Sequence, residues 1–178
     1  MIKFICNSSM FLFGYYFHNY QEILEMYSLD KAVNYYGEIH TSQLNKIIHG
    51  LCMPLTMYGF LLSIPVILDL DKLYAYILRV WVFYFYLGLY CQIDTFYTIL
   101  FAIIYYYPFK FANIDYKKNV YTLMNGLCIS FYSLIIQEYV GHYFGGDKFS
   151  RLEGVLNAIF YAPYFGSREL YLSINNSF

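Results

Sequence analysis

Residues 51–68 read LCMPLTMYGFLLSIPVIL and contain no charged side chain. The hydrocarbon core of a bilayer needs about 20 mostly apolar residues per helix, so this stretch has nearly the length of a membrane-spanning helix. Asp69 and Asp71 follow it and end the run. Pro54 and Pro65 do not exclude a span, because neighbouring helices in a membrane can satisfy the carbonyl groups that a proline leaves free.

Two further charge-poor stretches lie downstream of this run. From Leu73 to Tyr107 the only charged residues are Arg79 and Asp94, and residues 119–137 carry none. The first stretch is too long for one span and long enough for two, with a turn near GLYCQID. These stretches therefore predict three more membrane-spanning helices.

A shorter apolar run, residues 154–165, contains Pro163 and predicts an interfacial or re-entrant helix instead of a span. Together the runs predict an all-α, polytopic membrane protein of about four transmembrane helices plus this short helix. We expect residues 31–172 to form a single membrane-embedded domain. Residues 1–30 are then an N-terminal extension, and residues 173–178 a C-terminal tail.

The overall composition agrees with a chain whose main partner is the lipid bilayer. Hydrophobic residues make up 60% of the sequence and charged residues 13%, whereas an average soluble domain has roughly a quarter charged residues. The formal net charge of −1 offers no basic field for nucleic acid, which we exclude as a partner. The four cysteines form no CxxC pair, so neither a zinc knuckle nor a disulfide framework is indicated.

Two of the four histidines, His40 and His49, lie in YYGEIHTSQLNKIIHGLCMP, residues 35–54, just ahead of the first apolar run. If that run starts on one side of the membrane, four crossings return the chain to the same side after residue 137. His142 is then on the same face as the first two histidines, although it is far from them in sequence. The sequence predicts that three histidines converge.

The local sequence around the first two histidines supports this convergence. On one straight helix His40 and His49 would point in opposite directions. Thr41 and Ser42 are good N-cap residues, however, so we expect a helix to begin just after His40. Asn45 and His49 are then at positions i and i+4 on one helix face and address the same point.

Neutral imidazole suits iron, zinc or copper, and a mononuclear site with open positions is typical of non-haem iron oxygen chemistry. Three histidines and one carboxylate would satisfy such an ion. The candidate carboxylates are Glu38, Glu138 and Asp147, the last in the glycine-containing segment GHYFGGD. The alternative is that the histidines are amphipathic anchors at the membrane surface and bind no metal.

The remaining unusual polar residues are interpreted as structural. His18 has no neighbouring candidate ligand, and a surface or interfacial position is the expectation for it. Arg79 and Asp94 are charges inside apolar stretches, where burial is costly. We expect them either to pair across the predicted turn, or Arg79 to extend to the membrane surface.

Three motifs carry a resemblance to a known family. They are HTSQLNKIIHGLCMP at 40–54, YVGH at 139–142 and NAIFYAPYF at 157–165. With these motifs in this order, the chain resembles the small membrane proteins that include the yeast 2-hydroxy fatty acid dioxygenase. The likeness extends from about residue 35 to residue 169.

The resemblance implies an iron(II)-dependent enzyme of the endoplasmic reticulum membrane. Its substrates would be a 2-hydroxy fatty acid and dioxygen, and it would remove one carbon from the acid in the alpha-oxidation that follows phytosphingosine breakdown. By the same resemblance His40, His49 and His142 hold Fe(2+), and Asn45 belongs to the catalytic site. A 2-hydroxy acid offers a carboxylate and a hydroxyl oxygen as a chelating pair.

The chain departs from the family pattern near the last histidine. Gly146 stands where the family carries a glutamate four residues after His142, and Asp147 next to it is the candidate replacement. Glu138, where the family commonly has a glutamine, is a second candidate. The missing glutamate motivates an alternative function, a catalytically inactive membrane scaffold or lipid-binding protein with the same fold. A di-iron desaturase fits poorly, because the chain has four histidines and no HxxH spacing.

Overall fold

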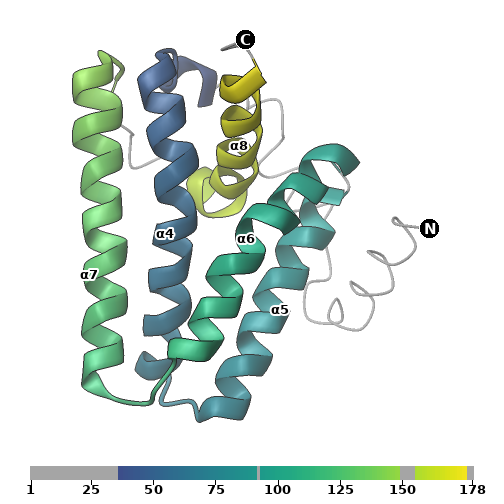
Figure 1. Cartoon of the computed structure of the whole chain (residues 1–178), viewed down its shortest axis with the longest axis vertical. Helices are drawn as coiled ribbons and strands as arrows, with labels where there is room; N and C mark the ends of the chain where they lie inside the picture. The colour runs from purple at the N-terminus through teal and green to yellow at the C-terminus, as the bar shows by residue number, and fades with distance from the viewer. Residues whose placement is uncertain (1–35, 92, 149–154, 176–178) are drawn as a thin grey trace.

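The computed structural model describes residues 36–91, 93–148 and 155–175, and every regular element in these ranges is a helix (Figure 1). The elements are α4 (Gln43–Ile67), α5 (Lys72–Cys91), α6 (Thr95–Asp115), α7 (Val120–Ile136), the π-helix η2 (Gln137–Tyr143) and α8 (Val155–Asn175). The predicted all-α fold is confirmed. His18 and the expected N-terminal extension lie outside the described residues.

Within the described ranges, three helical segments are long and apolar enough to cross a membrane. They are α4, α5 and the continuous segment Val120–Tyr143, which joins α7 to η2. These segments indicate an integral membrane protein. The fourth predicted span corresponds to α6, which has a similar length but is not among these three segments; it contains three consecutive tyrosines at 105–107, then Pro108 and Lys110.

The helices begin where short polar side chains can cap them. Ser42 Oγ accepts a hydrogen bond from Asn45 N at 3.1 Å at the start of α4. Asp94 caps α6 in the same way through Tyr97 N at 3.0 Å, and Asn119 caps α7. A capping side chain satisfies one of the backbone N–H groups that have no partner inside the helix.

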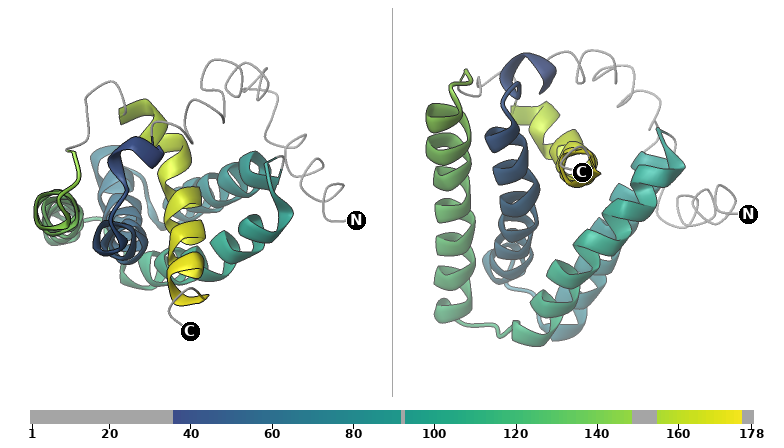
Figure 2. Two further views of the ribbon diagram at one scale, coloured as in Figure 1. Left: turned by 90° about the horizontal axis from the view of Figure 1, so that it is seen from above. Right: turned by 45° about the horizontal axis from the view of Figure 1, so that its top comes forward.

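Helix α4 is the centre of the bundle and contacts α7 on one side and α6 and α8 on the other, while α5 packs mainly against α6 (Figure 2). The four helices α4 to α7 alternate in direction. The end of α7 therefore returns to the end of the bundle where α4 begins (Figure 1). Because of this alternation, the segment that carries His142 lies at the same end of the bundle as His49.

Small residues allow α4 and α7 to approach closely. A Cβ atom added to Gly126 would lie 2.6 Å from the carbonyl oxygen of Gly59, a separation that real Cβ atoms do not reach. Along the same contact, Ser133 Oγ donates to Cys52 O at 2.7 Å and Thr56 Oγ1 donates to Ser133 Oγ at 3.0 Å. Small residues and interhelical hydrogen bonds are typical of helix contacts in membranes, where apolar burial alone gives little driving force.

Arg79, in α5, is almost completely buried and donates a hydrogen bond to the backbone of α4. Pro65 has no N–H group, so the carbonyl of Leu61, four residues earlier in α4, loses its usual helical partner. Arg79 Nε donates to that oxygen at 2.8 Å, and Nη1 donates to Asn113 Oδ1 at 3.0 Å. The guanidinium also lies 4.4 Å from the centre of the Tyr116 ring. The arginine therefore supplies the hydrogen-bond donor that the Leu61 carbonyl loses because of Pro65.

The expected pairing of Arg79 with Asp94 is replaced by these contacts. Arg79 lies near the start of α5, whereas Asp94 lies beyond its end and caps α6. The two residues are thus at different levels of the bundle.

Aromatic side chains fill the space between α5, α6 and α8. The buried cluster consists of Tyr36, Leu61, Leu62, Tyr86, Leu89, Tyr90, Phe101, Tyr105, Phe109, Ala112, Tyr161, Tyr164 and Phe165. Helix α8 is longer than the predicted short helix, because Pro163 and Gly166 do not end it and it continues to Asn175, inside the expected C-terminal tail. It packs on the end of the bundle where α4 begins (Figure 1).

Candidate metal centre

His40, His49 and His142 come together at the end of the bundle where α4 begins. His40 lies in the segment before α4, His49 is in the second turn of that helix, and His142 belongs to η2. One ring nitrogen of each histidine lies within 4.8 Å of the others, and all three side chains are buried. The predicted convergence of the three histidines is therefore observed.

The three rings lie close together with their planes at steep angles. His49 Nε2 and His142 Nε2 are 3.2 Å apart, and the two ring planes are nearly perpendicular, at 88°. The centre of the His40 ring is 4.3 Å from that of His49 and 4.9 Å from that of His142. Two nitrogens bound at about 2.1 Å to the same ion lie about 3.0–3.4 Å apart, so the spacing of the His49 and His142 nitrogens fits ligation of a single metal ion.

His40 is held in the tautomer that a metal requires. Its Nδ1 is 3.0 Å from the carbonyl oxygen of Tyr36, which can only accept, so the proton sits on Nδ1 and the lone pair on Nε2. That Nε2 atom is buried without a hydrogen-bond partner, an unusual state for a polar atom. Burial lowers the pKa of His40 to about 4, which keeps the imidazole neutral at physiological pH. The Tyr36 ring stacks on it with the ring centres 3.8 Å apart.

Asn45 connects the histidines to the rest of the site. Its Nδ2 donates to Ile39 O at 3.0 Å and to Asp147 Oδ2 at 2.8 Å, and it lies 3.3 Å from His142 Nδ1. A Cβ atom on Gly141 would stand 2.7 Å from Asn45 Oδ1, so the glycine before His142 lets η2 reach this amide. Asn45 thus packs against His142 and links the histidine cluster to the start of α4.

The π-helix sets the direction of His142. In η2 the backbone hydrogen bonds join residues five positions apart, so each turn holds about one more residue than a turn of an α-helix. His142 is completely buried, while the next residue, Tyr143, is exposed. π-helical segments are frequently found at functional sites.

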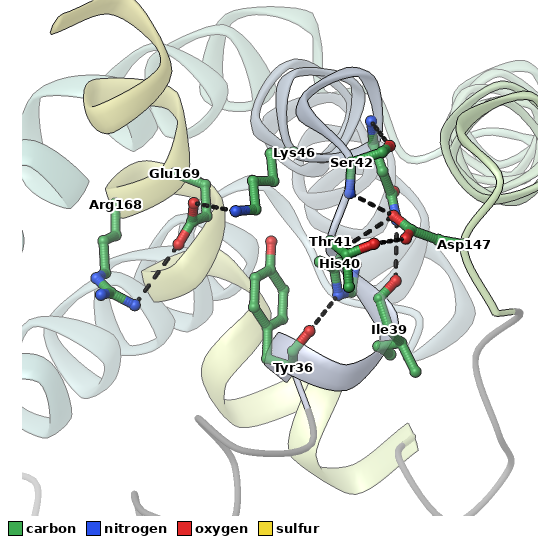
Figure 3. A network of polar contacts seen from close by, with 10 residues as sticks. Tyr36, Ile39, His40, Thr41, Ser42, Lys46, Asp147, Arg168 and Glu169 are labelled. Atoms are coloured by element: carbon green, nitrogen blue, oxygen red, sulfur yellow. Dashed lines mark hydrogen bonds and ion pairs between the residues drawn. The ribbon is translucent and has the colours of Figure 1, made fainter. Parts of the chain in front are cut away.

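Asp147 caps α4 and is separate from the histidine cluster, contrary to its tentative assignment as a ligand. Its carboxylate accepts from Thr41 N at 3.1 Å, Ser42 N at 3.0 Å, Asn45 Nδ2 and the Thr41 hydroxyl (Figure 3). Burial acts to raise the pKa of Asp147, but these donated hydrogen bonds outweigh it and hold the pKa well below its usual range. The carboxylate is therefore anionic and already saturated with donors.

The other candidate carboxylates also lie outside the cluster. Glu38 is exposed, and Glu138 is half-buried on η2. The neighbouring Gln137 is the residue that faces α4, donating through Nε2 to Thr56 Oγ1 at 3.1 Å. Among the described residues the group that could hold a metal consists of the three histidines.

The sequence reasoning missed a charged group beside the histidines. Lys46 Nζ lies 3.7 Å from Glu169 Oε2, and Arg168 Nη1 lies 3.5 Å from Glu169 Oε1 (Figure 3). Glu169 is buried although it carries a charge. Lys46 has a recognisable signal, because it follows Asn45 on the helix of the histidine motif. Nothing in the sequence indicated its partner in α8.

A cavity of about 380 Å³ lies towards the opposite end of the bundle, between α4, α6 and α7. Tyr58, Leu62, Asp115, Thr122, Asn125, Cys128 and Ile129 line it. It contains none of the three histidines, so it is separate from the candidate metal centre.

No family model, curated protein or solved structure matches the chain.

Proposed function

We propose that the protein is a non-haem iron(II) dioxygenase that removes one carbon from 2-hydroxy fatty acids within a membrane. The observation that carries the proposal is the convergence of three buried imidazoles. In one of them, His40, the proton is on Nδ1, and Nε2 is buried without a hydrogen-bond partner. The motif resemblance supplies the reaction and the choice of iron. The same resemblance leads us to propose the endoplasmic reticulum as the membrane.

The donor set agrees with this choice of metal. Three neutral imidazoles without a thiolate suit iron, zinc or copper, and a site with three protein ligands leaves positions for other molecules. Iron(II) held by His40, His49 and His142 would supply the capacity to bind and reduce dioxygen.

The protein residues around the histidines have separate tasks in this proposal. Tyr36 fixes the proton of His40 through its carbonyl oxygen, and Asn45 packs against His142 while it donates a hydrogen bond to Asp147. These contacts matter because the partners of a ligating histidine set the direction and the basicity of its ring. The apolar helices below the site would keep the acyl chain of the substrate among lipids.

The proposed reaction balances with dioxygen as the only oxidant. A 2-hydroxy acid and one dioxygen give the acid shortened by one carbon, carbon dioxide and water. The bond between C1 and C2 breaks, C2 becomes the new carboxyl carbon, and dioxygen accepts four electrons.

The test is a turnover experiment on detergent-purified protein. The protein is supplied with iron(II) without oxygen, mixed with 2-hydroxypalmitate labelled with carbon-13 at C1, and exposed to air. We expect pentadecanoic acid and labelled carbon dioxide. Iron-loaded protein that leaves the substrate unchanged would instead support the alternative, a membrane scaffold or lipid-binding protein.

A further inference from the structure

The charged group beside the histidines has more donors than acceptors. Lys46 and Arg168 contribute two positive charges, and Glu169 contributes one negative charge at separations of 3.7 and 3.5 Å, longer than a good hydrogen bond. The group therefore carries a net positive charge. The side chain of Glu169 is only 9% exposed, whereas those of Lys46 and Arg168 are 29% and 35% exposed, so both cations remain partly accessible to a second anion.

Tyr36 adds a neutral donor to the same place. Its hydroxyl group is buried and has no hydrogen-bond partner, and it points towards Lys46 and Glu169 (Figure 3). A buried hydroxyl without a partner is costly, and an acceptor that enters the site would remove this cost.

The group adjoins the metal centre directly. The ring of Tyr36 stacks on the ligand His40, and Lys46 lies on α4 between Asn45 and His49. Burial is the main cause of the lowered pKa of His40, and the charge of Lys46 makes a smaller contribution in the same direction. An anion held here would therefore sit on the α8 side of the three histidines.

We propose that Lys46, the Tyr36 hydroxyl and Arg168 form the subsite that binds the carboxylate of the fatty acid. The choice of a fatty acid rests on the proposed function, whereas the preference for an anion follows from the charges and the free hydroxyl. In the absence of substrate, Glu169 pairs with both cations, one at each carboxylate oxygen. The subsite selects acids over the corresponding alcohols or esters, since these lack the negative charge.

The test measures fatty-acid binding without turnover. Metal-free protein in lipid nanodiscs is titrated with palmitate and with hexadecanol, using displacement of a fluorescent fatty acid and empty nanodiscs for background. The variants are Lys46→Met and Tyr36→Phe, and the matched control is Lys72→Met, an exposed lysine of α5. Tyr36→Phe keeps the ring that stacks on His40, so it removes only the donor.

We expect both variants to weaken palmitate binding by about 10- to 100-fold, the range for losing a hydrogen bond to a charged group. Hexadecanol binding should be unchanged, and Lys72→Met should resemble the wild type. Unchanged palmitate affinity in Tyr36→Phe, which keeps the packing of the ring, would overturn the subsite even if Lys46→Met failed to fold.

The two proposals fail differently. Wild-type protein that binds palmitate through Lys46 but never converts 2-hydroxypalmitate would support the subsite and contradict the dioxygenase. Wild-type protein that converts the substrate, with palmitate affinity unaffected in both variants, would contradict the subsite alone.

Discussion

His49 and His142 bring their Nε2 atoms to 3.2 Å although 93 positions separate them in the sequence. Both nitrogens are buried, and two neutral imidazoles gain at most one hydrogen bond from such a contact. A metal ion between them would use both lone pairs. The contact also joins α4 to η2, so a metal ion bound here would couple its binding to the packing of these two helices.

The first prediction concerns the ligands. His49→Ala and His142→Ala should each weaken iron(II) or cobalt(II) binding by more than about 100-fold, the upper end of the effect of losing a residue that supports a ligand. Metal content after dialysis, together with the cobalt absorption spectrum, measures this. His18→Ala, which changes the fourth histidine of the chain, is the matched control. Equal metal loss in that control would contradict the assignment of the three histidines.

The second prediction concerns Asn45. Asn45→Ala should weaken metal binding by about 10- to 100-fold without abolishing it, because the three imidazoles remain but the amide that packs against His142 and bonds Ile39 O and Asp147 is lost. A chelator competition titration separates this effect from complete loss. Asn125→Ala, an exposed asparagine of α7, should match the wild type. If Asn45→Ala bound metal normally, His142 would be held by other contacts.

The third prediction compares two helix caps. Asp147→Asn should lower the free energy of unfolding by about 1 kcal/mol, because a carboxylate with four donors is replaced by an amide that also donates. Asp71→Ala removes the corresponding cap of α5, far from the histidines. Both should lose stability in an SDS titration, but only Asp147→Asn should also lose metal affinity.

The stability effect of Asp147 should depend on pH. Its pKa is lower in the folded than in the unfolded protein, so its contribution is fully present above the ordinary value of 3.8 and is lost as the pH falls below it. The stability difference between wild type and Asp147→Asn should therefore be constant from pH 7 to pH 5 and should narrow below pH 3.8. A difference that shrank already between pH 7 and pH 5 would implicate another group.

The fourth prediction is a double-mutant cycle on Arg79 and Pro65. Arg79→Met should destabilise the protein, since the carbonyl of Leu61 loses its donor. In a Pro65→Ala background that carbonyl regains a helical N–H, so the same arginine substitution should cost less. Unfolding free energies of the four proteins give the coupling. Independent effects would mean that Arg79 acts mainly through Asn113 and Tyr116.

The fifth prediction tests the close contact of α4 and α7. Gly59→Ala should cost about 1–3 kcal/mol, because the new Cβ would stand 2.5 Å from the carbonyl oxygen of Gly126. Moving the helices apart should also separate His49 from His142 and lower metal affinity. Gly37→Ala is the control, since a Cβ there meets nothing within 4 Å. Its stability and metal binding should equal those of the wild type.

Much of the fold follows from local signals in the sequence. The charge-free runs located α4 and α7, and Ser42 marked the first turn of α4. Alternation of helix direction then placed His142 near His49. Helix α8 was underestimated, because Pro163 and Gly166 end a helix only if their backbone groups have no other partner, and this depends on tertiary packing.

The roles of charged residues were harder to predict. Asp147 could be recognised as a possible ligand from its distance in sequence to His142, but its true partners, Thr41 and Ser42, are about 105 positions away. The partner of Arg79 was accessible in principle, because Pro65 always frees the carbonyl four residues earlier. The ion pair between Lys46 and Glu169 required the three-dimensional position of α8.

The π-helix has a consequence for how this site can change during evolution. Side chains in η2 point where they do because of the number of residues between α7 and the glycine loop. Removing one residue, Val140 for example, would restore α-helical spacing and turn the residues before it relative to His142, with every donor still present in the chain. The site would then be lost although all three histidines and Asn45 were still present in the sequence. The geometry of this candidate metal centre therefore depends on the number of residues in η2 as well as on the three histidines.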